Sequence, residues 1–191
     1  VTGVQTCALP ISLMKKSALR AIAAAFALTL TLSAASCKNT DEYAPPAGYT
    51  LASNENADYC LYVPDKWTVD MSTAAAGAYY SATDPSSVSV MGWDLQNYDS
   101  SLDEWWETNK TDLALVFTDF NEISEENTTL DELYAKRYTY TAKLGENSYK
   151  FLQEAAIKDG YVYVFTYTSL EDTFDSHLAE VEEILGYMVI K

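Results

Sequence analysis

The sequence predicts an α+β fold for residues 49–191, an antiparallel β-sheet with helices on both of its faces, or α/β/α sandwich. Segments with strand composition are separated by short turns, and two amphipathic helical segments lie among them. In Tyr161–Thr168, aromatic residues alternate with Val and Thr, so both faces of this segment need cover. This strand is therefore expected near the centre of a sheet with a layer on each side.

The first half of this region predicts short strands joined by turns. The predicted strands are Tyr49–Ser53, Asp58–Val63, Ala78–Ala82 and Ser87–Asp94. Pro64-Asp65-Lys66 forms a turn that directs Trp67 toward one end of the sheet, where we expect the indole to be largely buried. Asp84-Pro85-Ser86 forms the turn that joins the last two strands as a hairpin.

Helical periodicity begins at Ser101, whose side chain caps the helix while Glu104 completes a capping box. One face of this helix is lined by Leu102, Trp105, Trp106, Asn109, Leu113, Val116 and Phe117. The Trp105-Trp106 pair would serve as a ligand platform if it were exposed. At this spacing, however, at least one of the two indoles is expected in the core.

Beyond the polar segment Asn121–Thr129, which we assign to no element, three consecutive strands are expected. These strands are Leu133–Lys143, Ser148–Lys158 and Tyr161–Thr168. Leu144-Gly145-Glu146-Asn147 forms the first turn between them, and Asp159-Gly160 forms the second. The Asp-Gly pair is the strongest hairpin signal in the chain, because both of its residues readily take a positive φ.

A second helix is predicted from about Leu170 to Leu185, with Ser169 as its cap. Gly186 is expected to end this helix, since glycine is the residue that most readily closes a helix C-terminus. Tyr187–Ile190 can then return to the sheet as a short strand.

The segment before this domain has the order of an export signal. Met14-Lys15-Lys16 opens a basic stretch that reaches Arg20, and an apolar run from Ala21 to Leu32 follows. This run is shorter than the roughly 20 residues that a permanent membrane-spanning helix needs. Residues 14–36 are therefore predicted to be a cleaved signal peptide.

Ser33-Ala34-Ala35-Ser36 leads to Cys37 and resembles a bacterial lipobox, although Leu is commoner than Ala at the position of Ala34. In a lipoprotein, the thiol of this cysteine is joined to diacylglycerol before the signal is cleaved. Residues 37–48 then form a lipidated tether, in which the residues after Cys37 reach roughly 35 Å when extended. The alternative is an ordinary signal peptidase site, with Cys37 incidental.

Residues 1–13 match no known type of targeting signal, and we do not assign them to the folded domain. Val1–Ile11 resembles a common sequencing adapter translated in frame, and we interpret residues 1–13 as an artefact. The alternative is a real amino-terminal extension, but it would place an apolar segment with a proline before the basic stretch.

The residues after the leader form a strongly acidic protein. Lys15, Lys16 and Arg20 are three of the 12 basic residues, and none of the 28 acidic residues precedes Cys37, so the remainder has nine basic residues and a net charge of −19. Nucleic acid and anionic lipid headgroups are poor partners for such a surface. One explanation of this charge is an acidic face that binds cations or a basic partner. The simpler explanation is that the charge keeps an exposed protein soluble.

The domain carries no recognisable catalytic or metal-binding motif. Cys60 is expected to be a small buried hydrophobe, and His177 a solvated or hydrogen-bonded surface side chain rather than a general base. Acidic clusters without EF-hand spacing occur at Asp99, Asp103 and Glu104, at Glu125 and Glu126, and at Glu171, Asp172 and Asp175. We therefore predict no cofactor, no metal site and no enzymatic activity.

From about Tyr49 to Lys191, the order of elements resembles the PsbP-like group, which has the Mog1/PsbP fold. The most specific part is the strand Tyr59–Val63 followed by a turn, in which Pro64 and Trp67 are the signature residues. The resemblance implies a sheet between helical layers and, in bacteria, a lipoprotein. It also implies a binding or assembly role, since the plant protein supports the oxygen-evolving photosystem and Mog1 binds a small GTPase. No functional residue matches here, so neither role is carried over.

We therefore expect a lipid-anchored binding or assembly protein on the outer side of a bacterial cytoplasmic membrane, or on the outer membrane of a cell with two. Its partners would be the membrane, through Cys37, and another envelope protein. The alternatives are an extracytoplasmic hydrolase whose carboxylates converge only in the fold, and a receptor for a small solute or cation. Paired buried carboxylates in a deep groove would favour the hydrolase, an aromatic pocket the receptor, and a filled surface the assembly factor.

Overall fold

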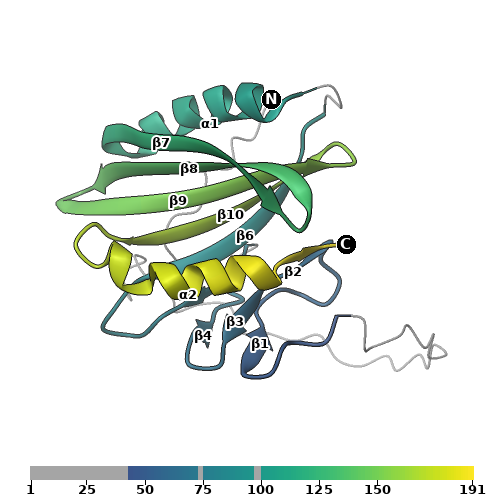
Figure 1. Ribbon diagram of the computed structural model, residues 1–191. Helices are drawn as coiled ribbons and strands as arrows, with labels where there is room; N and C mark the ends of the chain where they lie inside the picture. Colours follow the sequence, from purple (N-terminus) through teal and green to yellow (C-terminus); the bar gives the residue numbers. More distant parts are fainter. Residues whose placement is uncertain (1–42, 73–74, 97–99) are drawn as a thin grey trace, which may run out of the picture.

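The computed structural model describes residues 43–72, 75–96 and 100–191, so the predicted signal peptide and Cys37 lie outside the described residues. A seven-stranded antiparallel sheet forms the centre, in the order β4-β5-β6-β10-β9-β8-β7 (Figure 1). In this order, the strands are Thr68–Val69, Ala76–Tyr79, Ser87–Asp94, Tyr161–Leu170, Asn147–Lys158, Leu133–Leu144 and Thr118–Leu130. The predicted α+β sandwich is confirmed, because α1 (Leu102–Val116) and α2 (Phe174–Tyr187) cover opposite faces of the sheet.

No helix within the described ranges is long and apolar enough to cross a membrane.

β10 occupies the centre of the sheet, as predicted, with β6 and β9 as its neighbours. Tyr163, Phe165 and Tyr167 belong to the hydrophobic cluster under α2, whereas Val162 and Val164 belong to the cluster under α1. Every residue from 162 to 169 is buried. The alternation of aromatic and branched residues in the sequence thus gives each face of the sheet its own core.

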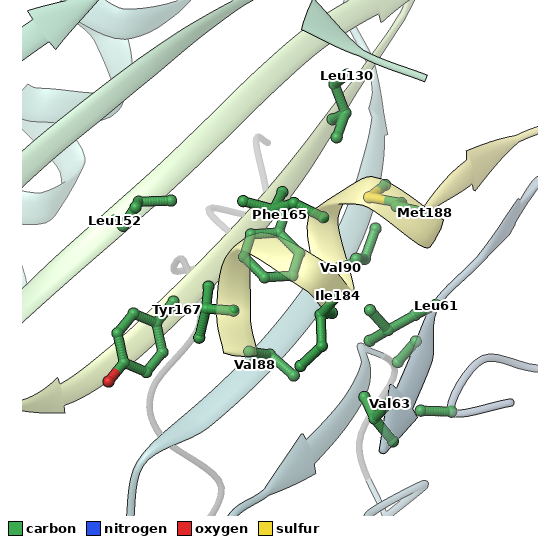
Figure 2. Packing of buried hydrophobic residues seen from close by; sticks show 14 of the residues in the cluster. Leu61, Val63, Val88, Val90, Leu130, Leu152, Phe165, Tyr167, Ile184 and Met188 are labelled. Carbon is green, nitrogen blue, oxygen red and sulfur yellow. The ribbon is translucent and has the colours of Figure 1, made fainter. Parts of the chain in front are cut away.

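The core under α2 is closed by four short strands in addition to the helix. Ile184 and Met188 extend from the helical segment toward Phe165 and the valines of β6, and Leu61 and Val63 approach from the amino-terminal strands (Figure 2). β1 (Tyr49–Leu51) pairs with β3 (Tyr62–Pro64), and β2 (Tyr59–Cys60) pairs with β11 (Val189–Ile190).

The prediction of one continuous strand over Asp58–Val63 is wrong, because the segment breaks at Leu61 and changes partner from β11 to β1. Cys60 through Pro64 are all buried, so no alternation marks where the pairing changes. Cys60 is a buried free thiol, as predicted.

The core under α1 is built on stacked aromatic rings. Trp106 is buried and stacks on Tyr138 with ring centroids 4.0 Å apart, while Trp105 is half-buried beside it. The predicted capping box is present, since the Ser101 side chain accepts from the Glu104 backbone and the Glu104 carboxylate accepts from the Ser101 backbone. The prediction that at least one indole belongs to the core is confirmed.

The sequence prediction missed the edge strand β7, which includes Asn121–Thr129. Most of its side chains are exposed, and its pairing with β8 contains two register shifts. An edge strand whose side chains are mostly exposed needs no apolar alternation, and charge and bulges protect it from pairing with other chains. Lys143 pairs with Asp119, and Lys136 pairs with Glu125, so ion pairs link β7 to β8.

Two predicted helix boundaries are also wrong. β10 continues to Leu170, and α2 begins only after Thr173. Ser169 does not cap the helix: its hydroxyl lies 2.8 Å from the Ser86 hydroxyl and 2.8 Å from the Thr173 hydroxyl. Gly186 does not end α2, which extends to Tyr187.

The predicted hairpin before α1 is confirmed, but the bounds of its first strand differ from the prediction. β5 pairs with β6 around the turn at residues 80–86, but it spans Ala76–Tyr79 instead of Ala78–Ala82. β4, with two residues, was not predicted. A two-residue edge strand carries too little periodicity to be detected from sequence.

A partly buried ion network joins α2 to the sheet. Arg137 Nε donates to Glu154 Oε1 at 2.6 Å, and its terminal nitrogens donate to both carboxylate oxygens of Glu182 at 2.6 and 2.7 Å. Glu154 is buried, and burial raises the pKa of its carboxyl while the charge of Arg137 lowers it. Because an unpaired carboxylate is costly at this depth, Arg137 fixes the position of α2 over β8 and β9.

Trp67 is buried against α2, with 4% of its surface exposed. Its Nε1 donates to Glu180 Oε2 at 2.7 Å, and its ring packs edge-on against Tyr80 at 5.6 Å between centroids. Trp67→Ala should therefore lower the free energy of unfolding by roughly 3–5 kcal/mol, measured by urea denaturation followed by circular dichroism. Trp105→Ala is the matched control and should cost less, because this indole is half-buried. An unchanged urea midpoint for Trp67→Ala would contradict the packing described here.

Candidate functional site

Two adjoining hollows lie on either side of Tyr59, and together they form what we call the Tyr59 groove. The larger hollow has a volume of about 460 Å³ and is lined by Asn54, Asn56, Ala57, Tyr59, Met71, Ala75 and Ala76. The smaller has a volume of about 270 Å³ and is lined by Ala57, Asp58, Tyr59, Met91, Gly92, Trp93, Tyr161 and Tyr163. Both hollows are open to solvent, so the groove gives little exclusion of water.

The carboxy-terminal residue holds the loop that carries one wall of the groove. Lys191 Nζ donates to the carbonyl oxygens of Glu55 at 3.2 Å and Ala57 at 2.8 Å, and the Lys191 backbone N–H donates to Asp58 O at 2.8 Å. Ser53 Oγ donates to Tyr59 O at 3.2 Å. These bonds fix the loop between β1 and β2 relative to the end of the chain.

The other wall of the groove is aromatic. The Tyr59 hydroxyl donates to Val90 O at 3.1 Å, and the rings of Tyr59 and Tyr163 meet edge to face with centroids 6.3 Å apart. Burial raises the pKa of both tyrosines, so their hydroxyls stay neutral at physiological pH. The groove therefore presents uncharged aromatic surface next to the carboxylate of Asp58.

Gly92 leaves room for the Tyr163 ring beside β6. A Cβ at this position would lie 3.3 Å from both Cδ1 and Cε1 of Tyr163, which is closer than ordinary contact. Gly92 itself is exposed in the wall of the smaller hollow. Any larger residue here would fill part of the hollow or displace the tyrosine.

A second cluster surrounds His177, on α2. Its Nε2 lies 2.7 Å from Asp84 Oδ2, and its ring packs on Tyr80 with centroids 4.1 Å apart. The side chain is 11% exposed, so of the two expected states the hydrogen-bonded one is confirmed and the solvated one is wrong. Trp67 supplies the second aromatic contact of the His177 ring, with a centroid distance of 6.3 Å.

The hydroxyl groups near this cluster do not form a nucleophile site. Ser86, Ser169 and Thr173 hydrogen-bond to one another in a chain, and the polar contact of His177 within the described residues is with Asp84. A nucleophile needs a base within hydrogen-bond reach, usually about 2.6–3.2 Å. The cluster holds the 80–86 turn onto α2 instead.

Four residues of the predicted acidic clusters, Asp103, Glu104, Glu125 and Asp175, make structural contacts. Lys136 pairs with both Asp103 and Glu125, which brings two of the clusters together around one cation. Glu104 completes the helix cap, and Asp175 pairs with Lys150 at 3.4 Å. Asp99 lies outside the described residues. Over the part of the chain that the structure describes, no three His, Cys, Asp or Glu side chains gather where they could hold a metal ion.

Of the predicted site residues, Cys37 lies outside the described residues, whereas Pro64 and Trp67 lie buried at the end of β3 and beside α2. The Tyr59 groove was not predicted, because its walls come from segments far apart in sequence. One signal was available: a glycine inside the strand β6 indicates close approach of another group.

Comparison with solved structures identifies the fold. Cyanobacterial PsbP (CyanoP) from Synechocystis aligns over 82% of this chain and 98% of its own, with 16% identity and a TM-score of 0.56. The Ran-binding protein Mog1p of Saccharomyces cerevisiae aligns over 74% of this chain and 95% of its own, with 10% identity and a TM-score of 0.52.

LpqN of Mycobacterium tuberculosis, a protein involved in cell envelope biogenesis, aligns over 70% of this chain and 83% of its own, with 17% identity and a TM-score of 0.51. No protein-family model matches the sequence, and no curated protein matches it significantly. The chain thus has the Mog1/PsbP fold, as the sequence resemblance predicted.

Asp84 should make a pH-dependent contribution to stability. Burial raises the pKa of its carboxyl, but hydrogen bonds from Ser86 and His177 outweigh burial and hold the pKa below its ordinary value of 3.8. Because the pKa is lower in the folded state, this stabilisation is present above about pH 4 and is lost as the pH falls through the folded-state pKa.

Asp84→Asn should therefore lower the urea midpoint near neutral pH, and the difference from the unmodified protein should shrink below about pH 4. Asp172→Asn, at an exposed position after β10, is the control and should change little at either pH. A difference for Asp84→Asn that stays constant with pH would show that its charge contributes nothing.

Proposed function

We propose that this protein is a lipid-anchored, extracytoplasmic binding or assembly protein without catalytic activity. The observation that carries the proposal is the contrast between an open aromatic groove on the surface and polar groups that are paired with one another in the interior. The fold supports it, since proteins of the same fold include a Ran-binding protein and a protein involved in cell envelope biogenesis.

The paired polar groups argue against the hydrolase. Glu154 is the buried carboxylate of the described core, and it is bonded to Arg137 beneath α2 instead of facing a groove. A glycosidase needs two carboxyl groups that flank a substrate, roughly 5–10 Å apart across a cleft. The His177–Asp84 pair is held between α2 and a turn, and its contacts are structural.

If Cys37 is acylated, a short tether would hold the domain close to the membrane. The Tyr62 hydroxyl donates to Tyr43 O at 2.7 Å, and Lys191 Nζ lies 5.4 Å from the centroid of the Tyr43 ring. Tyr43 thus contacts the domain, and only residues 38–42 separate it from Cys37. A fully extended segment from Cys37 to Tyr43 spans about 20 Å, so the face around Tyr43 would lie next to the lipid surface.

A receptor for a small solute is the second candidate, and the Tyr59 groove favours it. Aromatic walls with few polar groups are typical of small-ligand sites, and the smaller hollow has this character. The receptor and assembly functions are compatible, because the same groove can accept a free solute or a side chain of a partner protein.

The anchor is tested by changing Cys37. The unmodified protein should partition with membranes, since two or more acyl chains give stable attachment. Cys37→Ser should release the protein or leave an uncleaved precursor, as measured by membrane fractionation and the mass of the mature protein. Cys60→Ala is the control and should keep the membrane attachment, because Cys60 is buried in β2. Identical fractionation and mass for Cys37→Ser and the unmodified protein would contradict the lipid anchor.

A further inference from the structure

We propose that the smaller hollow of the Tyr59 groove is a binding site for an organic cation, an ammonium or guanidinium group held between tyrosine rings and a rim of carboxylates. The inference rests on the proposed binding function and names the chemistry that the groove would recognise. The ring surface, the rim charges and the shape of the hollow each point to this class of ligand.

The pairing of β6 with β10 places the aromatic and acidic groups on one face of the sheet. Tyr161 lies directly opposite Asp94, and Tyr163 lies directly opposite Gly92. Directly opposed residues in an antiparallel pair project from the same face. This face belongs to the α2 side of the sheet, since Tyr163 is part of the core beneath that helix, and Asp58 joins it from the preceding loop.

Tyr161 supplies the exposed ring surface of the hollow, whereas Tyr163 is 6% exposed and lines the hollow from the core side. Tyr161 is 41% exposed, and its ring lies 6.4 Å from that of Tyr163 between centroids. Gly92 adds no side chain over the Tyr163 ring, where a Cβ would already be in close contact. A cation within about 6 Å of a tyrosine centroid is attracted by the negative charge of the ring face.

The rim consists of three carboxylates: Asp58 lines the hollow, Asp94 lies opposite Tyr161 in the pairing of β6 with β10, and Asp159 lies in the turn before Tyr161. Among the ion pairs of the described residues, none includes Asp58, Asp94 or Asp159. The nearby lysines are used elsewhere: Lys158 Nζ donates to Ile190 O at 2.9 Å, and Lys191 Nζ donates to backbone carbonyls of the loop.

The negative charge of this rim reaches the buried tyrosine. After burial, the charge of Asp58 is the largest cause that raises the pKa of Tyr163, and the charge of Asp159 contributes as well. The negative potential of the rim therefore extends to the tyrosine that lines the hollow.

The geometry favours an organic cation over a metal ion. A tight calcium site needs six to eight oxygens converging on one point, and no group of three suitable ligands occurs within the described residues. A hollow of about 270 Å³ with aromatic walls instead suits an organic cation, such as a methylated ammonium group or a planar guanidinium group. Anions would be repelled by the rim, and neutral ligands would gain nothing from it.

The test is a titration of the mature, lipidated protein in a maltoside detergent, with its tyrosine rings labelled with carbon-13 and observed by nuclear magnetic resonance. The probes are tetramethylammonium, Nα-acetyl-lysine methylamide and Nα-acetyl-arginine methylamide. Sodium chloride at matched ionic strength controls for screening, and tert-butanol is a neutral probe of similar shape. We expect saturable shifts of the Tyr161 and Tyr163 signals with at least one cation, and no saturation with tert-butanol or sodium.

Variants separate the site from the rest of the surface. Tyr161→Ala should weaken cation binding roughly two- to fivefold, which is the usual value of one partly exposed ring. Asp58→Asn combined with Asp94→Asn should weaken it further while retaining the shape of the hollow. Tyr134→Ala is the matched control, because this tyrosine is 60% exposed on β8, outside the residues that line the groove, and it should leave binding unchanged.

The outcomes distinguish the source of the cation. Binding of tetramethylammonium alone indicates a free solute, whereas binding of the lysine or arginine probe indicates a side chain of a partner protein, and either supports the site. Shifts that rise linearly for every cation, equal binding of tert-butanol, or an equal loss in Tyr134→Ala would overturn it. The lipid anchor is scored separately by fractionation, so a failure of cation binding leaves the proposed function standing.

Discussion

The two-sided burial of β10 is the constraint on which the rest of the structure depends. A strand that is apolar on both faces can be stable only where a layer covers each face, and α1 and α2 provide these layers. β6 and β9 then satisfy the backbone of β10 on both edges, and the outer strands follow from the chain connections. The edge strand β7 is polar because it lies farthest from the central strand along this half of the sheet.

Buried polar groups refine this architecture. On the α2 face, Arg137 connects Glu154 in the sheet to Glu182 on the helix. On the α1 face, Asn109 Nδ2 donates to Gln153 Oε1 at 3.3 Å, and Gln153 Nε2 donates to Thr166 Oγ1 at 3.1 Å. Each chain of contacts ties a helix to adjacent strands, and the cost of leaving such groups unpaired restricts the helices to one position.

The groove and the tether lie at the same end of the domain, and Lys191 joins them. Its ammonium group bonds the loop at Ala57, which lines the groove, and also lies over the ring of Tyr43, where the tether meets the domain. If Cys37 is acylated as proposed, the groove would be held near the membrane surface. A binding site in that position suits a partner that is itself part of the envelope.

The sequence by itself determined the elements whose signals are local: the capping box at Ser101, the Asp159-Gly160 hairpin and the central position of β10. These elements depend on the backbone preferences and the side-chain alternation of a few consecutive residues, which can be identified directly from the sequence. Only the tertiary structure decided the change of partner at Leu61, the pairing of β7 and the burial of His177 against Asp84. It also decided the Tyr59 groove, because Tyr59, Gly92 and Tyr163 meet only when three distant segments pack together, and the distances between such segments are not encoded in any one of them.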